Sequence, residues 1–231
     1  MAENKRKSPA DKLAEKGHAR LAAGDYEQAL KCFSEAAALF KQDSNLNGQA
    51  AQLQIVAEIY RQTERIDLAL ETYSELVGLY DRLNAEDQKV EVLSTMGFFS
   101  AMQHSYLKAL SFFQQALEIS KRLGDERYMA QQLGNIGSSY RELNENESAL
   151  ESYRQALPLY RKLGHGEGAA DQCTNIAYIL VRTDRIKEAL SWYRKALPLY
   201  KKAESREKFD LTKQNIEHLK NHPGLIKNEG T

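Results

Sequence analysis

The chain has 231 residues and carries 32 basic and 32 acidic side chains, so its formal net charge at pH 7 is zero. This balance gives no reason to expect a polyanion such as nucleic acid as a partner. No apolar run approaches the roughly 20 residues that cross a bilayer, and the polar amino terminus lacks an apolar signal region. These properties favour a cytoplasmic protein that does not act on a membrane.

A repeat with a period of 40 residues runs through the chain. Its clearest marker is the dipeptide Ala-Leu, which recurs without slippage at Ala29-Leu30, Ala69-Leu70, Ala109-Leu110, Ala149-Leu150 and Ala189-Leu190. A fixed period in this range is typical of a solenoid, in which no unit buries its apolar face alone. The uninterrupted period therefore favours one elongated array.

Taken in chain order, the elements begin with a predicted flexible tail at residues 1–8, where Ser8 should cap a first helix that Pro9 opens. Each repeat is then predicted to form two helices, and the five repeats cover about residues 9–42, 45–83, 86–123, 126–163 and 166–203. Residues 205–220 keep the register of a sixth first helix, so we expect them to cap the last repeat. Residues 221–231 are expected to form a flexible tail.

Equivalent positions of the repeats carry similar side chains. Apolar residues of the first helices are spaced by three, four and seven, which places them on one helical stripe. One column of this stripe is always small: Gly17, Ala57, Gly97, Gly137 and Ala177. The second helices have an aromatic column: Phe33, Tyr73, Phe113, Tyr153 and Tyr193. We expect the small residues to let a neighbouring helix approach closely.

The fourth repeat shows the pattern most clearly, with L-x2-I-G-x2-Y over residues 133–140 and A-x3-Y over residues 149–153. This pattern resembles the tetratricopeptide repeat, with leucine in place of its usual tryptophan. The 40-residue variant is similar to the repeats of kinesin light chains and of the Leu-Gly-Asn family of polarity adaptors. The resemblance implies an all-α fold, a right-handed superhelix of five helix-turn-helix repeats plus a capping helix. The first repeat departs most, because Lys16 and Arg20 fall in core columns.

Residues that could carry catalysis or bind a metal are few. The glycine-rich stretch Gly164–Gly168 lacks the preceding strand of a nucleotide-binding fold. His218 and His222 are four residues apart, but two ligands do not make a closed zinc site. Cys173 occupies a leucine column and should be a buried filler, too distant from Cys32 for a disulfide. We predict no enzyme activity, no metal and no cofactor.

The candidate binding surface is the face of the first helices that lies off the packing stripe, because first helices line the concave surface of such arrays. In the adaptors that the chain resembles, an asparagine of this motif contacts the backbone of a bound peptide. That resemblance implies peptide contacts for Asn135 and Asn175, and less strongly for Asn215; alternatively, these amides bond neighbouring helices or water. The other candidates on this face are Arg61, Phe98, Ser138, Arg141, Tyr178 and Arg182.

The sequence therefore predicts a non-catalytic scaffold that holds a peptide segment of another protein in a concave groove. Affinity would come from many modest contacts along a preformed surface. The alternative is a self-assembling structural oligomer, with arrays joined end to end or face to face. A protein or peptide is the predicted partner in either case, and a homo-oligomer remains open.

Overall fold

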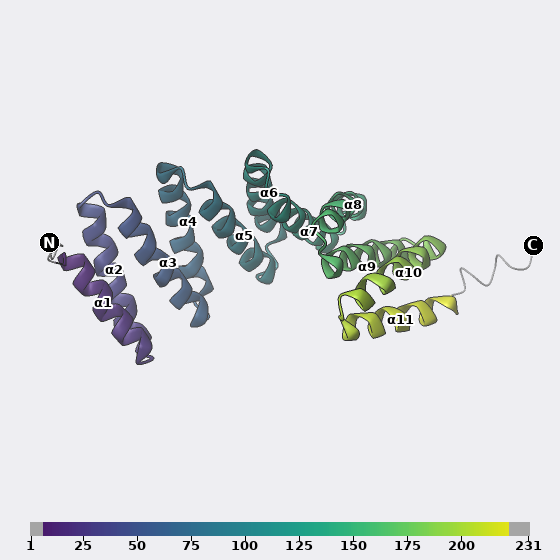
Figure 1. The fold of residues 1–231 in the computed structure, drawn as a ribbon, viewed down its shortest axis with the longest axis horizontal. Coiled ribbons are helices and arrows are strands. Elements are labelled where there is room, and N and C mark those ends of the chain that lie inside the picture. The colour runs from purple at the N-terminus through teal and green to yellow at the C-terminus, as the bar shows by residue number, and fades with distance from the viewer. Residues whose placement is uncertain (1–6, 222–231) are drawn as a thin grey trace, which may run out of the picture. The chain divides into compact units, whose positions relative to one another are not determined.

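A computed structural model describes residues 7–221, which form eleven α-helices and no strand (Figure 1). The helices are α1 (Pro9–Ala22), α2 (Tyr26–Gln42), α3 (Leu46–Gln62), α4 (Ile66–Leu83), α5 (Glu86–Met102), α6 (Tyr106–Leu123), α7 (Glu126–Glu142), α8 (Asn146–Lys162), α9 (Gly166–Arg182), α10 (Ile186–Lys202) and α11 (Arg206–Lys220). The predicted all-α fold of five helix pairs and a closing helix is confirmed. The predicted tails lie outside the described residues, apart from Lys7, Ser8 and Asn221.

The chain divides into two compact units, Met1–Phe99 and Ser100–Thr231, and the boundary lies inside α5. In the first unit, α1 packs on α2, α2 on α3, and α3 on α4. In the second unit, each helix from α6 to α11 packs on the next one along the chain. Such packing between neighbours in sequence is the arrangement that repeat proteins use to build a core. None of the described helices combines the length and apolarity needed to span a bilayer.

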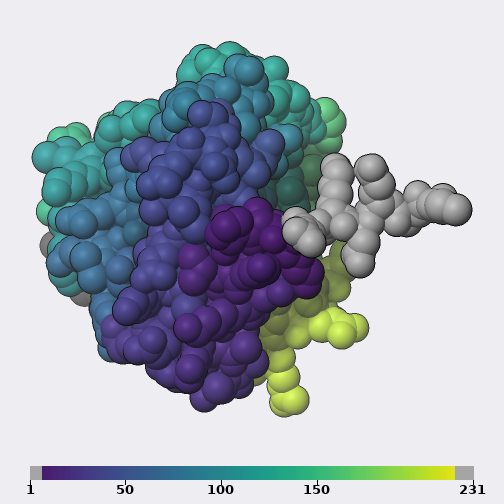
Figure 2. Space-filling model, turned by 90° about the vertical axis from the view of Figure 1, so that its left-hand side faces the viewer, coloured from purple at the N-terminus to yellow at the C-terminus, as the bar shows by residue number. Residues whose placement is uncertain are grey.

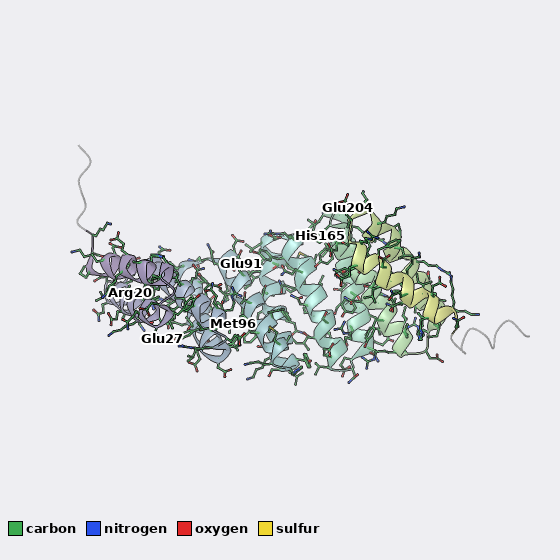
Figure 3. The ribbon with its side chains drawn as sticks, turned by 90° about the horizontal axis from the view of Figure 1, so that it is seen from below. Arg20, Glu27, Glu91, Met96, His165 and Glu204 are labelled. Carbon is green, nitrogen blue, oxygen red and sulfur yellow. The ribbon has the colours of Figure 1, made fainter. Side chains whose placement is uncertain are left out.

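The first helix begins with a capping box. The Ser8 hydroxyl accepts a hydrogen bond from the Asp11 N–H at 3.1 Å, and the Asp11 carboxylate accepts one from the Ser8 N–H at 3.0 Å. Lys16 and Arg20 are exposed on α1, and Figure 3 labels Arg20. Figure 2 shows α1, in purple, at the surface of the first unit. The two charged residues in core columns therefore make α1 a polar end of its unit.

Each turn between successive described helices contains one residue in the left-handed conformation. These residues are Gly24, Ser44, Glu64, Asn84, His104, Gly124, Asn144, Gly164, Asp184 and Glu204. At Asn144 the backbone N–H bonds to Arg141 O at 3.0 Å, and the next N–H, of Glu145, bonds to Tyr140 O at 2.9 Å. These bonds satisfy carbonyls that the helix end would leave free, as left-handed caps do. Only three of the turns use glycine, so the turn chemistry is weakly marked in the sequence.

The small column and the aromatic column of each repeat fit together. A β-carbon on Gly137 of α7 would lie 2.6 Å from Cε1 of Tyr153 on α8. A β-carbon on Gly17 of α1 would lie 2.8 Å from Cε1 of Phe33 on α2. All five aromatic residues of the column are buried. The expectation that small residues permit close helix packing is confirmed at these two positions.

The closing helix α11 completes the core of the second unit. Its Ile216 and Leu219 are buried in one cluster with Ile176 of α9 and Leu190 of α10. Its outer side is charged and exposed, with Arg206, Asp210, Lys213, Glu217 and Lys220. This division between an apolar inner side and a charged outer side is what a terminal cap of a repeat array requires.

Candidate functional site

Three of the predicted site residues lie together in the second unit. The guanidinium carbons of Arg141 on α7 and Arg182 on α9 lie 5.6 and 5.9 Å from the ring centre of Tyr178 on α9. Both distances fall within the range of cation–π contacts. Tyr178 nevertheless remains 46% exposed, so much of its side chain is open to a partner. We refer to Arg141, Tyr178 and Arg182 as the Arg–Tyr–Arg cluster.

The cluster forms because two of its residues share a helix face and because hydrogen bonds to neighbouring side chains orient both arginines. Tyr178 and Arg182 are four residues apart on α9 and therefore share a face. Arg182 Nη2 donates a hydrogen bond to Oδ1 of Asn144 at 2.5 Å. Asn144 is the left-handed residue of the turn after α7. Arg141 Nε and Nη2 donate to Glu142 Oε1 at 3.0 and 2.8 Å. A guanidinium has five N–H donors, so both arginines keep donors for an added acceptor.

The sequence did not identify Asn144 as part of this surface. The residue lies in a turn that no aligned column covers, and its role depends on a contact with a side chain one repeat later. A signal was present all the same, because asparagine is among the few residues that tolerate the left-handed conformation found there, with φ of 62°.

The predicted asparagines are half-buried, at one position each on α7, α9 and α11. Among the described residues, none makes a hydrogen bond to the side chains of Asn135, Asn175 or Asn215. Ser138 differs, because its hydroxyl accepts a hydrogen bond from the phenol of Tyr153 at 3.2 Å. Ser138 therefore helps to hold the buried aromatic column, whereas the three amides keep their hydrogen-bonding capacity.

Arg61 and Phe98 belong to the first unit and are not part of the Arg–Tyr–Arg cluster. Arg61 is exposed on α3, and its Nε donates to the carboxylate of Glu58 at 2.7 Å. This bond raises the pKa of the Arg61 guanidinium and lowers the pKa of the Glu58 carboxyl group. Phe98 is 58% exposed on α5 and meets Phe99 edge-on, with ring centres 5.9 Å apart. Each residue is therefore an exposed side chain of the first unit and not a member of a cluster.

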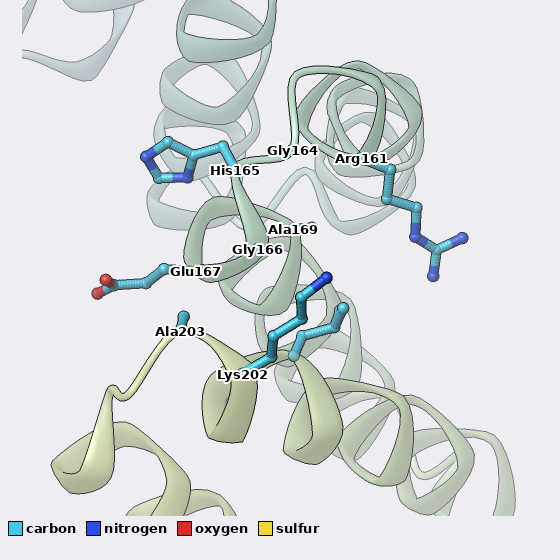
Figure 4. Close-up of a pocket in the computed structure, with 9 residues that line it drawn as sticks. Arg161, Gly164, His165, Gly166, Glu167, Ala169, Lys202 and Ala203 are labelled. Carbon is cyan, nitrogen blue, oxygen red and sulfur yellow. The ribbon is translucent and has the colours of Figure 1, made fainter.

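A pocket of about 420 Å³ opens at the turn before α9 (Figure 4). In Figure 4, Lys202 rises beside the first turn of α9, whereas His165 and Glu167 extend on the other side of that helix. Gly164 supplies the left-handed residue of the turn, with φ of 68°. His165 Nδ1 accepts a hydrogen bond from the N–H of Gly168 at 2.9 Å and so caps α9. The glycine-rich stretch thus works as a turn and a helix start.

A network of polar side chains attaches α11 to the rest of the second unit. Lys208 Nζ lies 2.9 Å from both carboxylate oxygens of Asp171 and 2.7 Å from Oε1 of Glu167. The Tyr200 phenol donates to Asp171 Oδ1 at 2.7 Å. The bond from Lys208 lowers the pKa of the Glu167 carboxyl group, and burial raises the pKa of the Tyr200 phenol. This network fixes the helix that carries Asn215.

Neither cysteine forms a disulfide, and both are buried. Cys173 is fully buried in a cluster of α8, α9 and α10, as expected for a filler. Within residues 7–221, no group of three or more histidine, cysteine, aspartate or glutamate side chains is placed to hold a metal ion. His222 of the candidate histidine pair lies outside the described residues.

Comparison with protein-family models gives three matches. Models described as tetratricopeptide repeat match residues 88–162 and 169–207. The model described as soluble NSF attachment protein, SNAP, matches residues 3–120, about half of the chain. No curated protein matches the chain.

Solved structures with a similar fold include proteins of several kinds. RapI in its apo form superposes with a TM-score of 0.79 at 21% identity, over 95% of this chain and 62% of RapI. A Rap protein complexed with Competence and Sporulation Factor gives 0.61 at 15% identity, over 88% of this chain and 57% of that protein. The putative kinesin light chain repeats of Podosopora anserina give 0.63 at 12% identity, over 85% and 98%. The chain thus spans less than two thirds of either Rap protein, and these likenesses concern the fold.

Proposed function

The chain belongs to the tetratricopeptide repeat family, and from this premise we propose that it is a non-catalytic scaffold that binds a polypeptide segment of another protein. The binding surface is the exposed side of the first helices in the second unit. We call it the first-helix face, and it comprises Asn135, Arg141, Asn175, Tyr178 and Arg182.

The Arg–Tyr–Arg cluster is the observation that carries this proposal. An exposed aromatic ring with two guanidinium groups within about 6 Å of its centre offers an apolar surface close to charged hydrogen-bond donors. Tyrosine and arginine are the residue types that most often dominate binding energy at interfaces. Guanidinium groups bind carboxylates with short, charge-assisted hydrogen bonds. The preferred partner segment therefore carries an acidic side chain beside an apolar one.

The asparagines extend this surface along the repeats. Each primary amide offers one acceptor oxygen and two N–H donors, which is the complement of a peptide group. Asn135 and Asn175 stand at equivalent positions one repeat apart, and neither amide is used within the described structure. They can therefore bond two separate peptide groups of an extended segment while the cluster binds its side chains. A Rap protein of similar fold has been solved in complex with Competence and Sporulation Factor, which supports the binding of a partner by a protein of this fold.

Self-assembly is the alternative function, and two observations disfavour its end-to-end form. The outer side of α1 is polar, with Lys16 and Arg20 exposed, and the outer side of α11 carries five exposed charged residues. Charged residues are depleted from the cores of stable interfaces. We therefore expect light scattering to give the mass of one chain, with or without removal of α1.

Peptide selection tests the proposed function. Binders are selected from a random peptide library on the wild-type protein, and the dissociation constant of one labelled binder is measured by fluorescence anisotropy. We expect the double variant Asn135→Ala/Asn175→Ala to bind at least tenfold more weakly. The control is Arg154→Ala, because Arg154 is exposed on the second helix α8 and should leave affinity unchanged. Equal affinity of the double variant and the wild type would refute the proposal.

A further inference from the structure

A groove of about 320 Å³ lies in the first unit and shares no residue with the first-helix face of the second unit. Its walls are side chains of the second helices α2 and α4, and its floor is formed by α3, including Leu53 and Val56. The volume is at the lower end of the range of about 300–1,000 Å³ that is usual for small-ligand pockets. The groove can therefore hold one or two side chains of a partner.

The groove exists because one side chain of the repeat pattern is short. Ala37 lines the groove, and the equivalent residues of the other four repeats are larger: Val77, Leu117, Leu157 and Leu197. In the third repeat, Leu117 packs in one cluster with Leu133 and Ile136 of α7. These two residues are the equivalents of Leu53 and Val56, which lie 80 residues earlier. The space that Leu117 fills in its own repeat is therefore left open beside Ala37.

A buried amide adds a polar requirement to this apolar space. Gln49 of α3 lines the groove, is 3% exposed, and donates from Nε2 to Oε1 of Glu75 on α4 at 2.9 Å. This bond fixes the orientation of the amide, because a carboxylate only accepts. Within the described residues, Gln49 Oε1 has no hydrogen-bond partner. A buried acceptor without a donor is unfavourable, so an occupant that carries N–H groups is preferred.

We propose that the groove of Ala37, Leu53, Val56 and Gln49 is a docking site for an aliphatic side chain of a partner polypeptide. The occupant has the chemistry of leucine, because the repeats themselves place valine or leucine in this space. A peptide N–H group that flanks such a side chain supplies the donor that Gln49 Oε1 lacks. This site is formed by α2, α3 and α4 of the first unit and does not depend on the proposed peptide site of the second unit.

Titration with N-acetyl-leucine amide tests this site, because the probe carries the isobutyl group and the flanking N–H groups. Methyl NMR of protein labelled at alanine, valine and leucine follows Ala37, Val56 and Leu53. We expect saturable shifts at these methyl groups, and at least tenfold weaker binding of N-acetyl-alanine amide. In Ala37→Leu, which restores the side chain of the third repeat, the saturable shifts should be lost while the thermal midpoint does not fall.

Two further variants complete the test. Val77→Leu makes a similar change at the equivalent position of the second repeat, which does not line the groove, and should bind the probe as the wild type does. Ala37→Val adds a smaller side chain, in case leucine is too large for the site. It should still weaken binding of the probe at least tenfold. The proposal is overturned if the wild-type protein shows no saturable shifts, which is the result expected of a groove that holds only water. It is also overturned if Ala37→Leu and Ala37→Val bind the probe as strongly as the wild type does.

Discussion

Gly137 on α7 faces the ring of Tyr153 on α8 so closely that a β-carbon would lie 2.6 Å from Cε1 and 2.7 Å from Cδ1. The ring is fully buried, and its phenol is held by Ser138, so it has little room to move. Gly137→Ala therefore sets a clash of about 1–3 kcal/mol against a helix-propensity gain of about 1 kcal/mol. We expect a net loss of stability, measured as a lower midpoint in urea.

Gly78→Ala is the matched control for this prediction. Gly78 lies inside α4, and a β-carbon there would meet nothing within 4 Å. The substitution should stabilise the protein by up to about 1 kcal/mol through helix propensity alone. If Gly137→Ala raised the urea midpoint as much as Gly78→Ala does, the close packing of the small and aromatic columns would be refuted.

Gln132 on α7 is fully buried, and neither polar atom of its amide has a partner among the described residues. Leaving such groups unpaired costs about 1–3 kcal/mol. Gln132→Met keeps the length of the side chain and removes the amide, so we expect a higher denaturation midpoint. A lower midpoint would show instead that an ordered water pairs the amide.

The two buried thiols should be inert in the native state. Burial raises the pKa of the Cys173 thiol, and the thiolate is the reactive form. We expect reaction with Ellman's reagent at mildly alkaline pH to be at least a hundredfold slower in native protein than in urea. Rapid modification of Cys173 in the native protein would contradict its placement in the cluster of α8, α9 and α10.

The attachment of α11 should weaken in acid. The bond from Lys208 holds the pKa of Glu167 below its usual value of 4.5. A lowered carboxyl pKa contributes stability that is complete above the unfolded pKa and is lost as the pH falls through the folded pKa. Amide exchange in α11, corrected for intrinsic rates, should therefore quicken relative to α9 below pH 4.5. Lys208→Gln should reduce this pH dependence, and an unchanged dependence would contradict the role of the ion pair.

Much of the fold could be predicted because its determinants recur at one period. The column of Gly17 and Gly137 is readable in the sequence, and so is the aromatic column that it packs against. The ion-pair network around Lys208 could not be predicted in the same way. Lysine occurs at that position only in the closing helix. The equivalent residues of the repeats include Ser8 and Gly168. Contacts that occur once leave no periodic signal.

The candidate site was predictable only in part, for a related reason. Helix register placed Tyr178 and Arg182 on one face, but the contact with Arg141 depends on how α7 and α9 pack. The groove beside Ala37 was missed because alanine is a common helix residue and draws no notice by itself. The groove could have been found by comparing Ala37 with its equivalents, since every other repeat has valine or leucine at that position.

The affinity of a selected, labelled peptide for Tyr178→Ala is the most direct test of the proposed binding face. Because Tyr178 is 46% exposed, its truncation should leave the helical circular dichroism and the thermal midpoint unchanged. We predict a dissociation constant at least tenfold higher than that of the wild type, with Arg154→Ala binding as the wild type does. Equal affinity of Tyr178→Ala and the wild type would contradict the account.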